Sequence, residues 1–409
     1  MSKKVPLILL TCLFMLLYAC GGPKIITIGV IVDLSGPTKE YGKSLKQGIE
    51  LAAARVNNDP AMREQFLGGF SLELKYFDSK GTKKGAKLAF LKLNREGISI
   101  LIGPMSSHAA IAVAPLAQKS ETLMLTPTAS TPNLSKVGGD FVMRNTSSDI
   151  IEAIKMSEAC KKIGFRNVAI LFQVNEYSTQ WASAFRTKFK ERKGEISKQR
   201  SFKGTEDDFS EVIDKTVSGD PDAILLVGYY EPCSKIIKQI RELETYYPIL
   251  GPGSFYNQNF HDLIKDYGAG IMFTFPDYDP KSTKPIVKQF VQEYQAKYNN
   301  VPDIFAASAY DSVILLVHAF KRAGSPSVTS GDLRDNLVKI QNFPGVSGET
   351  SFDKRGECIK PPKLGVLLED GSIMRVLIDD DESIQKYKDL IDSYSKQPGE
   401  ETEAEATEK

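Results

Sequence analysis

The feature that most constrains the fold is an alternation of short apolar runs with helical patterns, which occurs twice between about residues 25 and 280. The first round has strand-like runs at 25–32, 72–77, 98–102 and 123–125, and helical patterns at 43–57, 83–95 and 109–118. The second has runs at 168–172, 223–227, 249–251 and 271–275, and helical patterns at 179–193 and 233–244. Strands that alternate with helices of this length form parallel sheets covered by helices. The sequence therefore predicts an α/β protein with two Rossmann-like lobes, each built on a parallel sheet.

The pattern changes after residue 280. Three helical patterns follow one another, at 285–298, 305–323 and 332–340. Short strand-like runs come last, at 348–352, 364–368 and 374–377. We expect the helices to return to the first lobe and the last strands to the second. Lobe 1 would then hold residues 25–145 and 277–347, and lobe 2 residues 146–276 and 348–394. The chain would cross between the lobes near 145, 276 and 348, which makes a three-crossing hinge.

The two ends of the chain differ from the body. Lys3 and Lys4 precede an apolar run, Val5 to Ala19, that is short for a membrane span of about 20 residues. The run ends at Cys20 in a pattern that resembles a bacterial lipobox. This resemblance implies a signal peptide over 1–19, acylation of Cys20 and a tether over 20–24, so we expect an exported, membrane-anchored lipoprotein. Residues 395–409 contain five glutamates and no large apolar residue, which predicts a disordered acidic tail.

Composition and cysteine spacing exclude several classes of partner. Lys+Arg is 52 and Asp+Glu is 51, which argues against a broad nucleic-acid binder. The three histidines are well separated, so a multi-histidine metal site is not expected. Cys160, Cys233 and Cys358 form no CxxC pair. Either two of them form a disulfide or all three are reduced and buried. No metal or other cofactor is expected.

Motifs for enzymes are absent or faulty. Gly36 and the Gly42-Lys43-Ser44 run follow a strand, as in a phosphate-binding loop, but five residues separate the glycines where the motif needs four. Pro37 also removes one backbone N–H from such a loop. Residues 251–255 do not form the nucleophile elbow of a serine hydrolase. We therefore expect a binding protein and not an enzyme.

Loops at the carboxyl ends of the predicted strands are rich in hydroxyls and tyrosines. One loop ends in Ser106 and Ser107 at a helix start, and a neighbouring loop spans residues 126–132 with four hydroxyl side chains. In open parallel sheets ligands bind at this edge, and free N–H groups at a helix start favour an anion. The two loops predict a pocket for one carboxylate. Tyr41, Tyr177 and Tyr229 lie in loops of both lobes and are expected to close over a small ligand.

Several segments resemble the type I periplasmic solute-binding proteins of the leucine/isoleucine/valine-binding group. They are LSGPTKEYGKSLKQGIELA, IGPMSSHAAIAVAPLA, LTPTASTP, PDIFAASAYDSVILL, FPDYDP and FDKRGE, in order along residues 25–380. The resemblance implies a monomer whose two lobes close on a small solute and deliver it to an ABC permease. Its carboxylate site corresponds to Ser107, Thr128 and Ser130, its wall tyrosines to Tyr41, Tyr177 and Tyr229, and a second-lobe acid near the cleft to Asp149.

One departure from this family leaves the ligand open. Its amino-acid binders often hold the ammonium with an acid at the position that is Gly253 here. A buried ammonium without a counter-charge is costly. Either a different acid serves, namely Asp149, Glu176, Glu231 or Asp277, and the ligand is a branched-chain or other amino acid, or the ligand is an organic or aromatic acid, or an amide, without an ammonium. A further alternative is a lipoprotein sensor or activator of a cell-wall synthase that acts through protein contacts.

Overall fold

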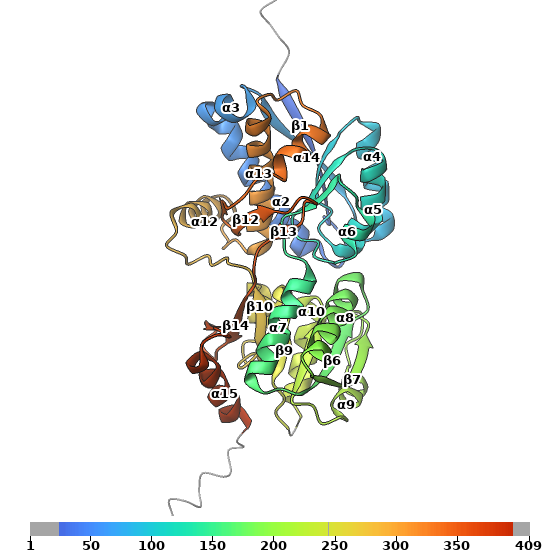
Figure 1. The fold of residues 1–409 in the computed structure, drawn as a ribbon, viewed down its shortest axis with the longest axis vertical. Coiled ribbons are helices and arrows are strands. Elements are labelled where there is room, and N and C mark those ends of the chain that lie inside the picture. The colour runs from blue at the N-terminus through green and yellow to red at the C-terminus, as the bar shows by residue number, and fades with distance from the viewer. Residues whose placement is uncertain (1–23, 244, 396–409) are drawn as a thin grey trace, which may run out of the picture.

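The computed structural model describes residues 24–243 and 245–395. They form two lobes joined by three chain segments (Figure 1). The predicted signal peptide, Cys20, the tether up to residue 23 and the tail from residue 396 lie outside the described residues. Each lobe has a sheet with helices on both faces, as the alternating pattern predicted.

Lobe 1 is built on a five-stranded parallel sheet in the order β2-β1-β3-β4-β5. Its strands are β1 (Ile25–Val32), β2 (Ser71–Asp78), β3 (Ile100–Ile102), β4 (Leu123–Thr126) and β5 (Val142–Arg144). Its helices are α2 (Lys39–Asn58), α3 (Pro60–Leu67), α4 (Lys83–Arg95), α5 (Ser107–Lys119), α6 (Leu134–Val137), α12 (Pro285–Tyr298), α13 (Ile304–Ala323) and α14 (Ser330–Leu337).

The period-two pattern of β1 explains how this sheet is covered. Ile28 and Val30 are fully buried in the cluster that contains the apolar faces of α2 and α13. Ile31 is buried on the opposite face, in the cluster formed with α4 and α5. Successive side chains of a strand point to opposite faces, so a strand buried on both sides is apolar throughout. α13 is long and apolar enough to cross a membrane, but most of it is buried in this core.

Lobe 2 is built on a seven-stranded sheet in the order β15-β14-β10-β9-β8-β6-β7. Its strands are β6 (Asn167–Gln173), β7 (Glu195–Phe202), β8 (Ala223–Val227), β9 (Ile249–Gly251), β10 (Met272–Phe275), β14 (Lys363–Leu367) and β15 (Ile373–Val376). Its helices are α7 (Asp149–Ile163), α8 (Glu176–Glu191), α9 (Ser210–Val217), α10 (Tyr230–Arg241), α11 (Gln258–Leu263), α15 (Asp381–Ser395) and the 3₁₀ turn η1 (Gly253–Phe255). The last two strands run antiparallel to their neighbours, so this sheet is mixed and not wholly parallel.

The third crossing lies at residues 360–362, not near residue 348 as predicted. β12 (Gly348–Phe352) pairs with β11 (Phe343–Gly345) and with β13 (Cys358–Ile359) in a small antiparallel sheet. Arg144, at the end of β5, holds this sheet on lobe 1 through an ion pair with Glu357. Residues 348–359 thus belong with lobe 1, and the chain enters lobe 2 only at β14 (Figure 1). The sequence pattern missed β11 because its three residues are Phe-Pro-Gly, which indicate a turn.

The cysteine alternatives are decided in favour of reduced thiols. Within the described residues Cys160, Cys233 and Cys358 are all buried and none is paired. Burial raises the pKa of each thiol, so each behaves as a small apolar side chain.

Candidate functional site

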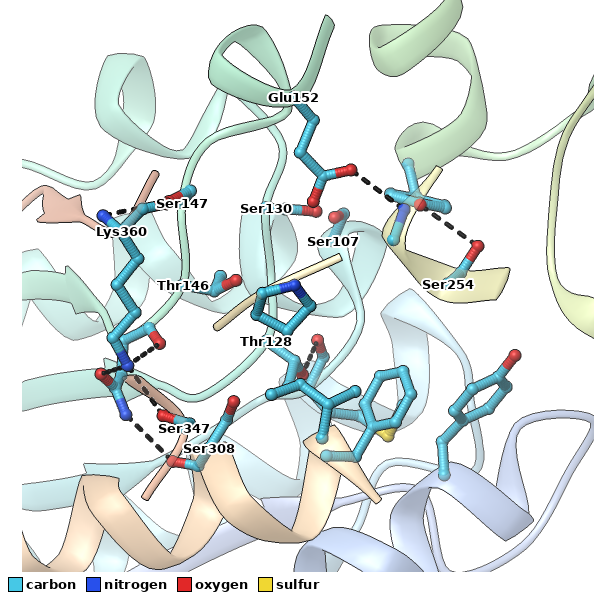
Figure 2. Close-up of a pocket in the computed structure, with 18 of the residues that line it drawn as sticks. Ser107, Thr128, Ser130, Thr146, Ser147, Glu152, Ser254, Ser308, Ser347 and Lys360 are labelled. Atoms are coloured by element: carbon cyan, nitrogen blue, oxygen red, sulfur yellow. Dashed lines mark hydrogen bonds between the residues drawn. The ribbon is translucent and has the colours of Figure 1, made fainter. Parts of the chain in front are cut away.

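A cavity of about 110 Å³ lies between the lobes. It has room for on the order of ten waters at roughly 10–15 Å³ each, which suits a small molecule and not a peptide. Its walls come from loops of both lobes and from the crossing segments: Tyr41, Met105, Ser106, Ser107, Thr128, Ser130, Asn145, Thr146, Ser147, Glu152, Tyr177, Tyr229, Gly253, Ser254, Pro276, Ile304, Phe305, Ser308, Ser347, Lys360 and Pro362. Figure 2 shows most of these side chains.

The predicted carboxylate residues meet at this cavity. Ser106 is the N-cap of α5 and Ser107 is its first residue, and both are buried. The Thr128 hydroxyl donates to the carbonyl of Met105 at 3.0 Å, which ties the two hydroxyl-rich loops together. Ser130 lines the same wall as Ser107 (Figure 2). Hydroxyls beside the first-turn N–H groups of a helix are the donors that a carboxylate needs.

The three predicted tyrosines form one aromatic wall that spans both lobes. The Tyr177 ring stacks on Tyr229 with centroids 6.1 Å apart, and Tyr229 lies 5.8 Å from Tyr41 of lobe 1. The Tyr41 hydroxyl accepts from the backbone N–H of Tyr230, across the cleft, at 3.3 Å. Desolvation raises the pKa of both Tyr41 and Tyr177, so the phenols stay neutral and can act as donors.

A second contact between the lobes involves Glu176. Its carboxylate accepts from Asn133 Nδ2 at 2.9 Å and from the Thr131 hydroxyl at 3.3 Å, both on lobe 1. These hydrogen bonds and the contact between Tyr41 and Tyr230 bring the two lobes into direct contact around the cavity. The structure therefore has the closed arrangement of a two-lobed binding protein.

Asp149 was expected near the cleft, and the structure places it behind the cavity wall. It is the first residue of α7, is fully buried and does not line the cavity. Neither carboxylate oxygen has a hydrogen-bond partner among the described residues. Burial, followed by the nearby Glu152 carboxylate, raises its pKa well above the ordinary value. Asp149 is therefore buried behind the residues that line the cavity and is not itself part of the lining.

The other three acids considered as replacements are also outside the cavity lining. Glu176 holds the lobes together, as described above. Glu231 is exposed at the start of α10. Asp277 forms ion pairs with Lys363 and Lys284 at the second crossing. None of these carboxylates is placed to meet a ligand in this cavity.

Glu152 is an acid at the cavity that the sequence pattern did not indicate. It lies one turn beyond Asp149 on α7 and lines the cavity. Its Oε2 accepts from the Thr274 hydroxyl at 2.7 Å, from the Gly253 N–H at 3.0 Å and from Trp181 Nε1 at 3.1 Å. Residues three apart lie on the same face of a helix, but the helix over 149–163 was not predicted. A helical interpretation of this segment would have pointed to Glu152.

Gly253 lies directly beside the Glu152 carboxylate. A Cβ on this residue would stand 3.0 Å from Glu152 Oε1 and 3.4 Å from Oε2. The Glu152 carboxylate thus lies next to residue 253, the position where the family often has its acid. A Cβ at residue 253 would require this carboxylate to shift by a few tenths of an ångström, and a longer side chain would compete with it for the same space.

The opposite side of the cavity is formed by the hinge. Lys360, in the third crossing, donates to Asn145 Oδ1 of the first crossing at 2.9 Å and to the Ser347 hydroxyl at 2.8 Å. Ser347 in turn donates to the buried carboxylate of Asp311. The Lys360 charge is thus balanced through Ser347, and the network joins two of the three crossing segments (Figure 2).

Comparisons with known proteins agree with this geometry. The family model described as "Periplasmic binding protein" matches residues 25–363. A Leu/Ile/Val-binding protein of Rhizobium johnstonii is 27% identical over 336 residues, which cover 81% of this chain and 88% of that relative. The crystal structure of a leucine-binding protein from Thermotoga maritima is 28% identical, covers 86% of this chain and 98% of its own, and superposes with a TM-score of 0.77.

A third comparison concerns the fold alone. A solute-binding protein of an ABC transporter from R. palustris, solved in complex with benzoate, is 20% identical and has a TM-score of 0.76. It covers 87% of this chain and 95% of its own. The family consists of substrate-binding proteins and not of enzymes. With two α/β lobes closed on a small cavity and a family match over most of its length, the chain belongs to the periplasmic binding protein family, in the type I group of the leucine/isoleucine/valine-binding proteins.

Proposed function

We propose that this protein is an exported solute-binding protein that closes its two lobes on a small carboxylate-bearing ligand and delivers it to an ABC importer. The observation that carries the proposal is the small hydroxyl-lined cavity enclosed between the two lobes. The names of its relatives, among them Leu/Ile/Val-binding proteins, support an amino acid as the ligand. The benzoate complex of a protein with the same fold supports the alternative, an organic or aromatic acid without an ammonium.

The geometry supports a simple binding cycle. A ligand carboxylate would meet the first-turn N–H groups of α5 and the hydroxyls of Ser107 and Ser130 on lobe 1. Closure then brings Tyr177 and Tyr229 of lobe 2 over the ligand and forms the contact between Tyr41 and Tyr230. Because these contacts exist only when the lobes meet, a ligand that touches both walls shifts the population toward the closed form. A permease can then recognise the closed form.

Replacement of Ser107 by alanine tests the carboxylate site. We expect Ser107→Ala to weaken binding of a carboxylate ligand by about 1–3 kcal/mol, because a buried donor is lost. Isothermal titration with a ligand first identified by a thermal-shift screen measures this loss. Ser327→Ala, on an exposed loop of the same lobe, is the matched control and should leave the affinity unchanged. Equal affinity in the Ser107 variant and the wild type would remove this hydroxyl from the site.

Lipid anchoring is the second part of the proposal and rests on the pattern that ends at Cys20. We expect Cys20→Ser to release the exported protein from the membrane, because a serine cannot be acylated as the thiol is. Detergent phase partitioning of exported protein measures this, with the wild type in the detergent phase and the variant in the aqueous phase. A variant that still enters the detergent phase would contradict acylation at this residue.

A further inference from the structure

We propose that Glu152 recognises an amine on the ligand, and that the ligand class is therefore a small α-amino acid. The inference rests on the proposed function and makes its ligand more specific. Three observations carry it: the hydrogen bonds of the Glu152 carboxylate, the charges that line the cavity, and the position of this carboxylate beside the hydroxyl-rich loops.

One oxygen of the Glu152 carboxylate is held by hydrogen bonds within the protein, and the other is free to accept a hydrogen bond from a ligand. Oε2 accepts from Thr274, Trp181 and the Gly253 N–H, which together fix the orientation of the side chain. No described residue donates to Oε1, and Glu152 lines the cavity. An ionised carboxylate only accepts hydrogen bonds, so the group that meets this oxygen has to be a donor. Its charge favours a cationic donor over a neutral one.

The charges around the cavity also favour a cationic group of the ligand at Glu152 Oε1. Among the lining residues of the described chain, Glu152 is the one acidic and Lys360 the one basic side chain. Lys360 donates to Asn145 and Ser347 on the hinge side, while Glu152 lies on the other side of the cavity (Figure 2). A partly buried carboxylate without a protein counter-charge is unfavourable unless a ligand supplies the charge. A ligand ammonium at Oε1 satisfies this requirement, whereas a second carboxylate would increase the repulsion.

The position of Glu152 identifies an α-amino acid among the possible amines. The backbone N–H of Asp149 donates to the carbonyl of Ser130 at 2.9 Å, which joins the start of α7 to the hydroxyl-rich loop of lobe 1. Glu152 is one turn further along α7, and Figure 2 shows it on the same side as Ser107 and Ser130. An α-amino acid carries its ammonium and carboxylate on one carbon, so the groups that bind them have to be neighbours. The tyrosines and Phe305 then contact its side chain.

Pairs of ligands that differ only in the amine test this inference in the wild-type protein. Isothermal titration would compare the proteinogenic amino acids with their α-keto acids and with benzoate, after unfolding and refolding to remove any carried ligand. We expect at least one amino acid to bind at least 100-fold more tightly than its keto acid. This comparison does not depend on whether a variant folds.

The variant Glu152→Gln then assigns the discrimination to one residue. The glutamine carbonyl oxygen can keep the three donors, and its NH₂ group replaces Oε1 and faces the ligand amine. We expect this variant to lose about 30-fold or more in affinity for the amino acid. Glu158→Gln is the matched control on the same helix, since Glu158 pairs with Arg192 and does not line the cavity. It should bind as the wild type does.

The outcomes separate this inference from the proposed function. Tight binding of keto acids or benzoate without binding of amino acids would overturn the role of Glu152 and leave the proposed function standing. The same holds if Glu152→Gln binds the amino acid as the wild type does. Absence of binding across the whole panel would overturn the proposed function and this inference with it.

Discussion

Gly48→Ala should lower the free energy of unfolding by about 3 kcal/mol, the upper end of the usual range for overpacking. Gly48 lies in α2 where this helix crosses α13. A Cβ at this position would stand 2.1 Å from the carbonyl oxygen of Ala306 and 2.9 Å from its carbonyl carbon. A backbone atom cannot turn aside as a flexible side chain can, so the two helices have to separate. Urea unfolding monitored by circular dichroism measures the loss.

The same substitution at Gly331 is the matched control and should have the opposite sign. Gly331 is also helical, in α14, but a Cβ there would meet nothing closer than Thr329 Oγ1 at 3.6 Å. Gly331 lies in the first turn of α14, where alanine is favoured over glycine by less than the roughly 0.5–1 kcal/mol of a helix interior. Gly331→Ala is therefore expected to be slightly more stable than the wild type. Similar effects of the two variants would show that close approach of α2 to α13 does not require glycine.

The Gly48 contact also has a functional consequence. α13 begins at Ile304, and its first two residues line the cavity between the lobes. A displacement of α13 away from α2 moves Ile304 and Phe305 with it. The Gly48 variant should therefore bind ligand more weakly even at temperatures where it is folded, and thermal-shift measurements with and without ligand would detect this.

The sequence predicted the fold where the pattern was long and regular. The β1 run and the helix over 83–95 are found as expected, because a buried strand is apolar on both faces and a helix is apolar on one. β7 was missed because its residues are mostly polar and half-buried at a sheet edge. The third crossing was misplaced because β11 contains Pro344 and Gly345, which do not indicate a strand.

The sequence predicted the binding residues of lobe 1 better than those of lobe 2. Ser107, Thr128 and Ser130 follow strands that the pattern identified, and the structure places them at one cavity. Asp149 and Glu152 lie on α7, which follows a crossing and was not predicted. The two residues are three apart on one helix, and only their contacts in the structure show that Glu152 and not Asp149 lines the cavity. Only the three-dimensional contact of Gly253 with Glu152 shows how these two positions are related.

Arg144→Met should cost about 3–5 kcal/mol of unfolding free energy, the usual loss when one partner of a buried ion pair is removed. Arg144 is 1% exposed and meets Glu357, which is 19% exposed. Two guanidinium nitrogens each contact one carboxylate oxygen at 3.1 Å, and the side chain also donates to the Thr131 carbonyl at 3.1 Å and the Ser135 hydroxyl at 2.9 Å. Methionine fills a similar volume but removes these guanidinium donors, and it leaves Glu357 with the Ser135 hydroxyl as a donor but without a positive charge beside it.

This ion pair has more than a local effect because of where it lies. Arg144 ends β5 immediately before the first crossing, and Glu357 precedes β13 and the third crossing. Its loss should loosen the small sheet that keeps residues 348–359 on lobe 1. Hydrogen exchange in that segment should therefore increase more in the Arg144 variant than in the rest of the lobe.

Two further variants separate the ion pair from the loss of a side chain. Lys75→Met removes an exposed pair with Glu96, at 41% and 35% exposure, and should cost far less than Arg144→Met because solvent screens an exposed pair. If the charge left on Glu357 is the main penalty, Arg144→Met combined with Glu357→Gln should be less destabilised than the sum of the two single variants. A strictly additive double variant, or a loss for Arg144→Met as small as that of Lys75→Met, would mean that this pair contributes no more than a surface contact.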